Sequence, residues 1–147
     1  MSKKRTEQTV VPGEYILHES PIAFNEKREE IRIKVRNTGD RPIQIGSHFH
    51  FFEANKALLF DRHAAYGKRL NIASTTAIRF EPGDEIEVPL ISVGGKKTLY
   101  GFNNLVDGWT GESPIANGER AEKIRTVNNA IALGYQNLKD EEPPVAE

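Results

Sequence analysis

Charged and apolar residues alternate strictly in two separate segments of the chain. In the first segment, Ile31, Ile33 and Val35 are each followed by a basic residue. In the second, residues 85–90 read Glu-Ile-Glu-Val-Pro-Leu. A period of two is typical of a strand that buries one face, so both segments are predicted to be strands. The proline at position 89 places the second strand at a sheet edge or at a bulge.

Shorter apolar segments bounded by turn residues extend this prediction to most of the chain. Pro82-Gly83 fits a type II turn, and Gly94-Gly95 fits a two-residue hairpin. The spacing predicts an all-β fold, a small antiparallel barrel or sandwich. The other predicted strands are Glu14–His18, Ile43–Phe52, Leu70–Ile72, Ala77–Phe80 and Thr98–Phe102.

Two stretches depart from the β pattern. Residues 54–68 predict an irregular loop with one or two helical turns that end at Gly67. Residues 118–133 predict a C-terminal helix, capped by Asn117 and closed by Gly134. Either the β body or another subunit must cover the apolar stripe of this helix, which consists of Ala121, Ile124, Val127 and Ile131.

The 147 residues are expected to form one β domain with extensions. Residues 1–9 and 139–147 are polar or proline-rich and are predicted to be mobile tails. The β domain is placed at residues 10–102, and residues 103–138 form a connector followed by the helix.

Composition excludes several classes of function. The chain has no cysteine, which excludes disulfides, thiolate metal sites and thiol nucleophiles. A net charge of −1 with both signs interspersed argues against nucleic-acid binding. The sequence shows neither a signal peptide nor an apolar stretch long enough to cross a bilayer, so a cytoplasmic protein with no membrane partner is expected.

His48 and His50 are the clearest candidates for chemistry. On a strand, residues i and i+2 share a face, so both imidazoles could hold one metal ion. Glu53, an odd number of residues away, would lie on the opposite face, and a third ligand would have to come from elsewhere. The run from Gly46 to Glu53 is superficially similar to the His-x-His motif of the cupins. A stand-alone metal-binding β-barrel that uses His48 and His50 is therefore the alternative function.

The same predicted strand also has a purely structural interpretation. Phe49 and Phe51 would pack into the core, while His48, His50 and Phe52 would face outward. An exposed strip of aromatic rings is more often covered by a partner than left in water.

Asp61 and Arg62 could act as a catalytic acid beside a phosphate-binding cation. Adjacent opposite charges in a loop are, however, usually an ion pair or an interface anchor. The residues alone therefore give no complete active site, which favours a binding partner or subunit over a catalyst.

Several ordered motifs closely resemble the beta subunit of bacterial urease, over about residues 10–102. They are Val11–Tyr15 (VPGEY), Val35–Phe51 (VRNTGDRPIQIGSHFHF), Leu59–Arg62 (LFDR), Gly67–Ile72 (GKRLNI) and Arg79–Gly83 (RFEPG).

The resemblance implies a chain that works with a large alpha and a small gamma subunit to hydrolyse urea to ammonia and carbamate. Two nickel ions and all catalytic residues would belong to alpha, and this chain would hold no cofactor. The beta subunit would be an antiparallel barrel or sandwich on the outside of alpha, with three heterotrimers around a threefold axis. The residues expected to contact alpha are Ser47, His48, His50, Phe52, Asp61, Arg62 and Arg69.

Two features depart from the family pattern. A turn that usually reads Pro-Ala-Gly-Thr-Ala is Ala-Ser-Thr-Thr-Ala at residues 73–77, which leaves its conformation open. Residues 103–147 extend beyond the shortest family members, and such extensions can mediate higher assembly. The helix is therefore expected to join trimers or to clasp a neighbouring alpha subunit through Ile124, Val127 and Ile131. The resemblance also makes urease accessory proteins candidate partners of this chain.

Overall fold

The two alternating segments form the longest strands, β1 (Glu30–Asn37) and β6 (Glu85–Ser92). They pair antiparallel, with Ile33 opposite Val88 and Val35 opposite Ile86. This computed structural model describes residues 11–111 and 121–138. The other elements are β2 (Ile43–Gly46), η1 (Phe51–Glu53), β3 (Leu58–Leu59), α1 (Arg62–Ala65), β4 (Lys68–Leu70), β5 (Ala77–Phe80), β7 (Thr98–Leu99), β8 (Gly108–Trp109) and α2 (Ala121–Ala132).

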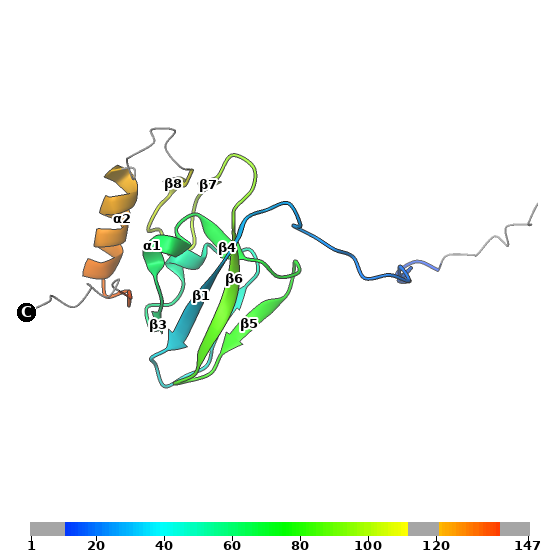
Figure 1. The fold of residues 1–147 in the computed structure, drawn as a ribbon, viewed down its shortest axis with the longest axis horizontal. Helices are drawn as coiled ribbons and strands as arrows, with labels where there is room; N and C mark the ends of the chain where they lie inside the picture. Colours follow the sequence, from blue (N-terminus) through cyan, green and yellow to red (C-terminus); the bar gives the residue numbers. More distant parts are fainter. Residues whose placement is uncertain (1–10, 112–120, 139–147) are drawn as a thin grey trace, which may run out of the picture.

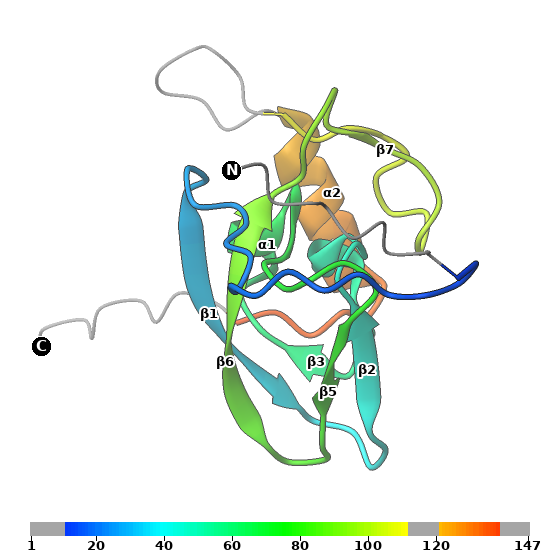
Figure 2. The same ribbon diagram turned by 90° about the vertical axis from the view of Figure 1, so that its right-hand side faces the viewer.

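The strands curl around one core, as an open half-barrel. A four-stranded sheet has the order β3-β1-β6-β4, and β2 pairs with β5 in a second, two-stranded sheet. Figures 1 and 2 show the β2–β5 ribbon lying beside the curled sheet, with α2 outside the strands. The predicted all-β fold with a short helical loop and a C-terminal helix is confirmed. The buried core includes Val35, Ile45, Phe51, Leu58, Phe60, Leu70, Phe80, Val88 and Leu90.

Pro89 was predicted to place β6 at a sheet edge or at a bulge. β6 instead lies between β1 and β4, and its register with β1 continues through Pro89 without interruption. β4 pairs only with the end of β6, from Leu90 to Ser92. Asn71 donates its backbone N–H to the carbonyl of Pro89 at 2.9 Å, but the proline has no N–H to return. The β4–β6 ladder therefore stops at Pro89, and the first half of β6 has only β1 as a neighbour.

The turn predictions had mixed outcomes. Gly83 has a φ of 80°, and Asp84 donates to the carbonyl of Glu81 at 3.1 Å, as a type II turn requires. The hairpin predicted at Gly94-Gly95 is wrong, because β7 pairs with β8 and not with β6. The strand predicted over Glu14–His18 is also wrong, since these residues are extended but have no strand partner.

The strand predicted over Ile43–Phe52 ends at Gly46. Ser47 donates its backbone N–H to the carbonyl of Thr76 at 3.0 Å, and the chain then turns into the 3-10 helix η1. His50, Phe51 and Phe52 are all fully buried. A straight strand points consecutive side chains to opposite faces, so burying three in succession requires this turn.

The predicted C-terminal helix is present as α2. Its first predicted residues, 118–120, and the predicted cap Asn117 lie outside the described residues, as do both predicted tails. Gly134, at a φ of 93°, closes the helix as expected. Val127 and Ala130 pack on a second cluster beneath the helix, which also contains Phe52, Tyr66 and Tyr135. Within the described ranges, no helix is both long enough and apolar enough to cross a membrane.

After α2 the chain returns to the β body and runs along β3. Leu138 donates to the carbonyl of Phe60 at 3.0 Å, and Gln136 donates to that of Lys56 at 3.1 Å. Asn137 forms a parallel bridge with Phe60. This return segment, residues 135–138, therefore covers the edge of the sheet beside β3, which sequence patterns did not predict.

Candidate functional site around His50

The two histidines lie in a turn and not on one face of a strand. His48 is exposed, and its Nδ1 hydrogen-bonds with the Ser47 hydroxyl at 2.8 Å. His50 is fully buried. The geometry on which a two-histidine metal site was predicted is therefore wrong, and so is the outward-facing strip that included His50 and Phe52.

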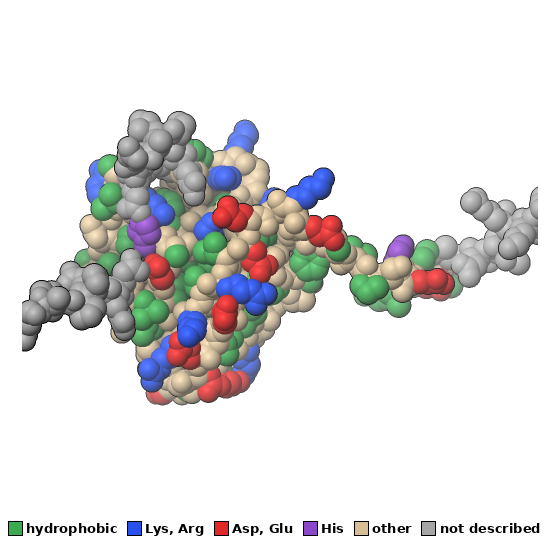
Figure 3. All heavy atoms as spheres, viewed as in Figure 1, with side chains coloured by type: hydrophobic (Ala, Val, Ile, Leu, Met, Phe, Trp, Pro, Cys, Tyr) green, Lys and Arg blue, Asp and Glu red, His purple; other side chains and the backbone are tan. Residues whose placement is uncertain are grey.

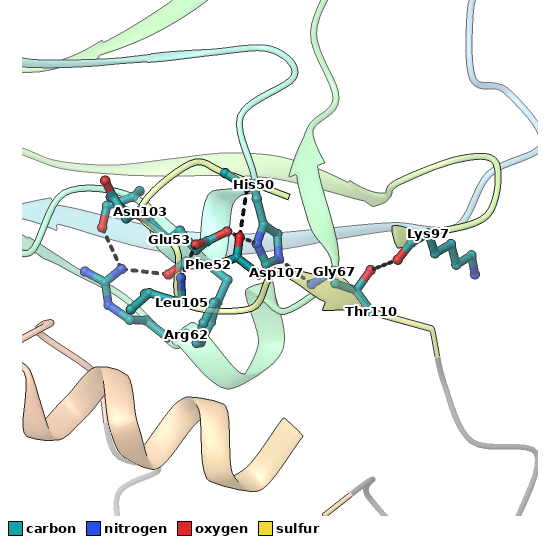
Figure 4. A network of polar contacts seen from close by, with 12 residues as sticks. His50, Phe52, Glu53, Arg62, Gly67, Lys97, Asn103, Leu105, Asp107 and Thr110 are labelled. Atoms are coloured by element: carbon teal, nitrogen blue, oxygen red, sulfur yellow. Dashed lines mark hydrogen bonds and ion pairs between the residues drawn. The ribbon is translucent and has the colours of Figure 1, made fainter. Parts of the chain in front are cut away.

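Both ring nitrogens of His50 are engaged inside the protein (Figure 4). Nε2 accepts the backbone N–H of Gly67 at 2.9 Å. Nδ1 must therefore carry the ring proton, which it donates to the Glu53 carboxylate at 2.7 Å. Glu53 was predicted on the opposite face from the histidines, but the 3-10 turn brings residue i+3 back beside residue i.

Glu53 continues this network into the connector. Its other carboxylate oxygen accepts the backbone N–H of Leu105 at 2.8 Å, and its carbonyl accepts the Asn103 side-chain amide at 2.6 Å. Phe102 packs edge-on against Phe49, with ring centroids 5.1 Å apart. One buried carboxylate thus joins η1 to a connector about 50 residues further along.

Gly67 can be only a glycine in this arrangement. Its φ is 70°, and a Cβ at this position would lie 2.9 Å from the carbonyl oxygen of Thr110. The close approach lets the Gly67 N–H reach His50 while the chain passes against the connector. The sequence marked Gly67 as a helix end and as part of a family motif, but not as a partner of His50, because the two residues are distant in sequence.

Arg62 is the largest fully buried side chain. All five of its N–H groups donate to backbone carbonyls, at distances from 2.7 to 3.0 Å. Burial lowers the pKa of Arg62 to about 10, with a smaller opposing effect from Tyr135, so the guanidinium stays charged at neutral pH. It also stacks on Phe60, 4.3 Å from the ring centroid. The accepting carbonyls belong to Phe52, Ala54, Asn55, Leu58 and Gln136.

Asp61 and Arg62 do not form the ion pair that the sequence favoured. The Asp61 carboxylate accepts the backbone N–H of Ala64 at 3.0 Å and caps α1. Arg62 donates away from it, to carbonyls. Asp61 therefore acts locally, whereas Arg62 joins the loop before α1 to the distant residue Gln136.

Arg69 lies in a cluster of cations beside β4. Its pKa is lowered by burial and by the neighbouring Arg28. Arg28 donates to the carbonyl of Ser92 at 3.2 Å, and Lys68 donates to the hydroxyl of the same serine at 3.2 Å. Among the described residues, no carboxylate forms an ion pair with Arg28, Lys68 or Arg69.

The predicted alpha-contact residues therefore divide into two groups. His50, Phe52 and Arg62 are fully buried within this chain, and Ser47 is nearly so. His48 is exposed, and Asp61 and Arg69 are half-buried, so these three offer surface to a partner. Across the described part of the chain, His, Asp and Glu side chains do not gather in groups of three or more that could hold a metal ion.

The sequence of this small β domain, in which His50 is bonded inside the chain, is similar to those of proteins that are subunits of an enzyme complex. The sequence model of the Urease beta subunit family matches residues 12–109. The chain belongs to this family.

Similar relatives come from several bacteria, and each is a protein called urease subunit beta. The Yersinia enterocolitica protein is 65% identical over 134 residues, which cover 91% of this chain and 82% of that protein. The Yersinia pseudotuberculosis protein is 63% identical over 138 residues, covering 94% and 96%. The Photorhabdus laumondii protein is 66% identical over 122 residues, covering 83% and 95%. Family membership makes this chain a subunit of urease, a hydrolase, and implies other urease subunits as partners.

Proposed function

We propose that this chain is a non-catalytic structural subunit of a cytoplasmic, nickel-dependent urease that hydrolyses urea to ammonia and carbamate. It packs on the alpha subunit, which carries the two nickel ions, in a complex that also contains gamma. The observation that carries this proposal is the bonding of His50 within a chain of this family. Both of its ring nitrogens hold the chain's own loops together, so neither is available to a metal or a substrate.

The proposed role is mechanical. A rigid β body that covers the outer surface of alpha would hold the scaffold around the nickel site without touching urea. Permanent interfaces of this kind bury roughly 2,000 Å² or more. The predicted contact residues that remain accessible are His48, Asp61 and Arg69. His48 lies shortly before η1, Asp61 caps α1, and Arg69 lies in β4.

The α2 helix is proposed to serve higher assembly of heterotrimers. Ile124 and Ile131 are 43% and 41% exposed, although they lie on a helix that already packs on the β body. Val127 faces the β body and is buried, so it has no surface for a second contact.

The test is to tag this chain, purify it gently from its own cells grown with nickel, and identify its companions by mass. We expect one larger and one smaller urease chain, together with urease activity. Arg69→Glu should reduce their recovery, because it reverses a charge on the proposed contact surface. Arg41→Glu is the matched control, on an exposed loop between β1 and β2. A chain that elutes alone with a bound metal would overturn the proposal and favour a stand-alone metal-binding barrel.

A further inference from the structure

The segment before β1 exposes apolar side chains to an unusual degree. Residues 11–24, here called the N-terminal arm, run away from the β body on the side opposite α2 (Figure 1). Tyr15, Ile16 and Leu17 are 88%, 76% and 84% exposed. Figure 3 shows hydrophobic side chains along this arm, at a distance from the rest of the described surface. Single exposed apolar residues are common, but three consecutive ones on an extended segment indicate a contact surface.

The backbone of the arm is also unpaired. Its sequence predicts a strand over Glu14–His18, yet the described chain provides no ladder for it. Glu14 donates to the carbonyl of Val11 at 3.0 Å, and the Ser20 N–H donates to the His18 ring at 3.2 Å. Between these two turns, residues 15–17 make no backbone hydrogen bond with any described residue. An apolar strand sequence with free N–H and C=O groups is suited to adding to the edge of a sheet.

The base of the arm is fixed beside β4. Asn25 has a φ of 59°, which turns the chain, and its side-chain amide donates to Asn71 at 2.9 Å. Arg28 is held by the carbonyl of Ser92. The arm therefore leaves the body at a defined point, next to the cations Arg28, Lys68 and Arg69.

The two outer strands of the four-stranded sheet, β3 and β4, do not suit the arm. The β3 edge is already covered by the return segment, residues 135–138. The β4 edge carries Lys68 and Arg69 and is followed by Asn71, which give no apolar cover. Pairing with the arm of a second copy would satisfy the backbone hydrogen bonds along one edge of each strand. It would leave the side chains on both faces of each strand exposed. Because Ile16 points opposite to Tyr15 and Leu17 on a strand, both faces are apolar and both need cover.

We propose that residues 14–18 add as a strand to an open sheet edge inside an apolar groove of another urease subunit, with carboxylates at the groove mouth facing Arg28 and Lys68. This inference rests on the proposed function, since it requires a urease complex. It goes further by assigning the contact to the arm, which the family comparison does not single out. The side chains supply the affinity through burial, and the backbone ladder fixes the register.

The experiment replaces Tyr15 by the photo-crosslinking residue p-benzoylphenylalanine in the tagged chain, within the complex purified from cells that make this urease. We expect ultraviolet light to join the chain to a urease subunit other than beta, identified by mass. Ile16→Pro, which removes one N–H from the strand, should lower recovery of that subunit about tenfold. Ala23→Pro, in the arm but outside the strand, is the matched control. Both variants should melt like wild type, because residues 11–24 belong to neither of the two described core clusters.

The outcomes separate the two proposals. If the wild-type chain recovers no other urease subunit, the proposed function fails and the inference fails with it. If it recovers them but Tyr15 crosslinks to its own β4, to a second beta copy or to nothing, only the inference is overturned. An Ile16→Pro chain that recovers its partners as well as Ala23→Pro would also overturn it.

Discussion

The Nε atom of Arg62 donates to the backbone carbonyl of Gln136, 2.7 Å away and 74 residues later in the chain. Its four other N–H groups hold the loop from Phe52 to Leu58. The neighbouring backbone N–H of Arg62 donates to the Asn137 side chain at 2.9 Å. One residue thus fixes the return segment against the β body, and α2 with it.

Arg62→Lys should destabilise the chain by about 3 kcal/mol, because lysine has three donors without the planar fork and leaves buried carbonyls unpaired. Chemical denaturation followed by fluorescence measures the loss. Arg69→Lys is the matched control, since Arg69 is half-buried and makes one long hydrogen bond, 3.4 Å to the carbonyl of Leu70. We expect it to change the free energy of unfolding by less than about 0.5 kcal/mol. Equal losses in the two variants would contradict the role given to Arg62.

Glu53→Gln should cost about 2 kcal/mol, although the two side chains have the same shape. The carboxylate accepts at both oxygens, from His50 and from Leu105. A glutamine side chain can accept at its oxygen but donates from its nitrogen. His50 cannot move its ring proton to Nε2, because this N–H would then face the N–H of Gly67. One buried donor therefore always meets another donor.

The measurement is unfolding free energy together with amide exchange at Leu105 and Gly67, which should accelerate in Glu53→Gln. The wild-type His50 ring should show its proton on Nδ1 by nitrogen NMR. Glu85→Gln, on the exposed end of β6, serves as control and should leave both readouts unchanged. A ring proton on Nε2 in the wild type would refute this network.

Sequence patterns predicted the parts of the fold that depend on local alternation. β1 and β6 lie where the alternating apolar residues placed them, and β5 lies where a short apolar segment between turn residues placed it. Gly83 and Gly134 take the positive φ values that their positions required. These features depend on neighbours in sequence and on one core face. A pattern of period two or 3.6 therefore contains the necessary information.

The candidate site was predictable only in its location. The sequence drew attention to His50 and Arg62, but it gave both the wrong surroundings. Their partners include Gly67 for His50 and Gln136 for Arg62, which are 17 and 74 residues away. Both contacts are made through backbone groups, which no side-chain motif marks. The spacing of His50 and Glu53, three residues apart, was the one local signal of a turn.

Thr75→Gly should stabilise the chain by about 1 kcal/mol. Thr75 lies at a φ of 69°, where a β-branched side chain is strained, in the turn that replaces the family's usual glycine-containing sequence. The turn is still closed by the Thr76 N–H on the carbonyl of Ala73, at 3.2 Å. Glycine should relieve the strain and keep this bond.

The matched variant is Gly83→Ala, at a φ of 80° with open space around its Cβ position. Because only backbone strain changes there, we expect a loss of about 1 kcal/mol. Thermal melting of both variants tests the pair. A Thr75→Gly chain that melts below wild type would show that the threonine side chain contributes more than its backbone strain costs.

The two sides of α2 should respond differently to the same substitution. Val127→Asp puts a charge into the cluster of Phe52, Tyr66 and Tyr135, so it should release the helix and remove the amide protection of residues 121–132. Ile124→Asp combined with Ile131→Asp changes only exposed positions and should leave that protection intact. If α2 joins heterotrimers, the double variant should instead lower the particle mass, measured by light scattering on the purified complex. An unchanged mass would remove higher assembly from the proposed role of the helix, while intact protection in Val127→Asp would contradict its packing on the β body.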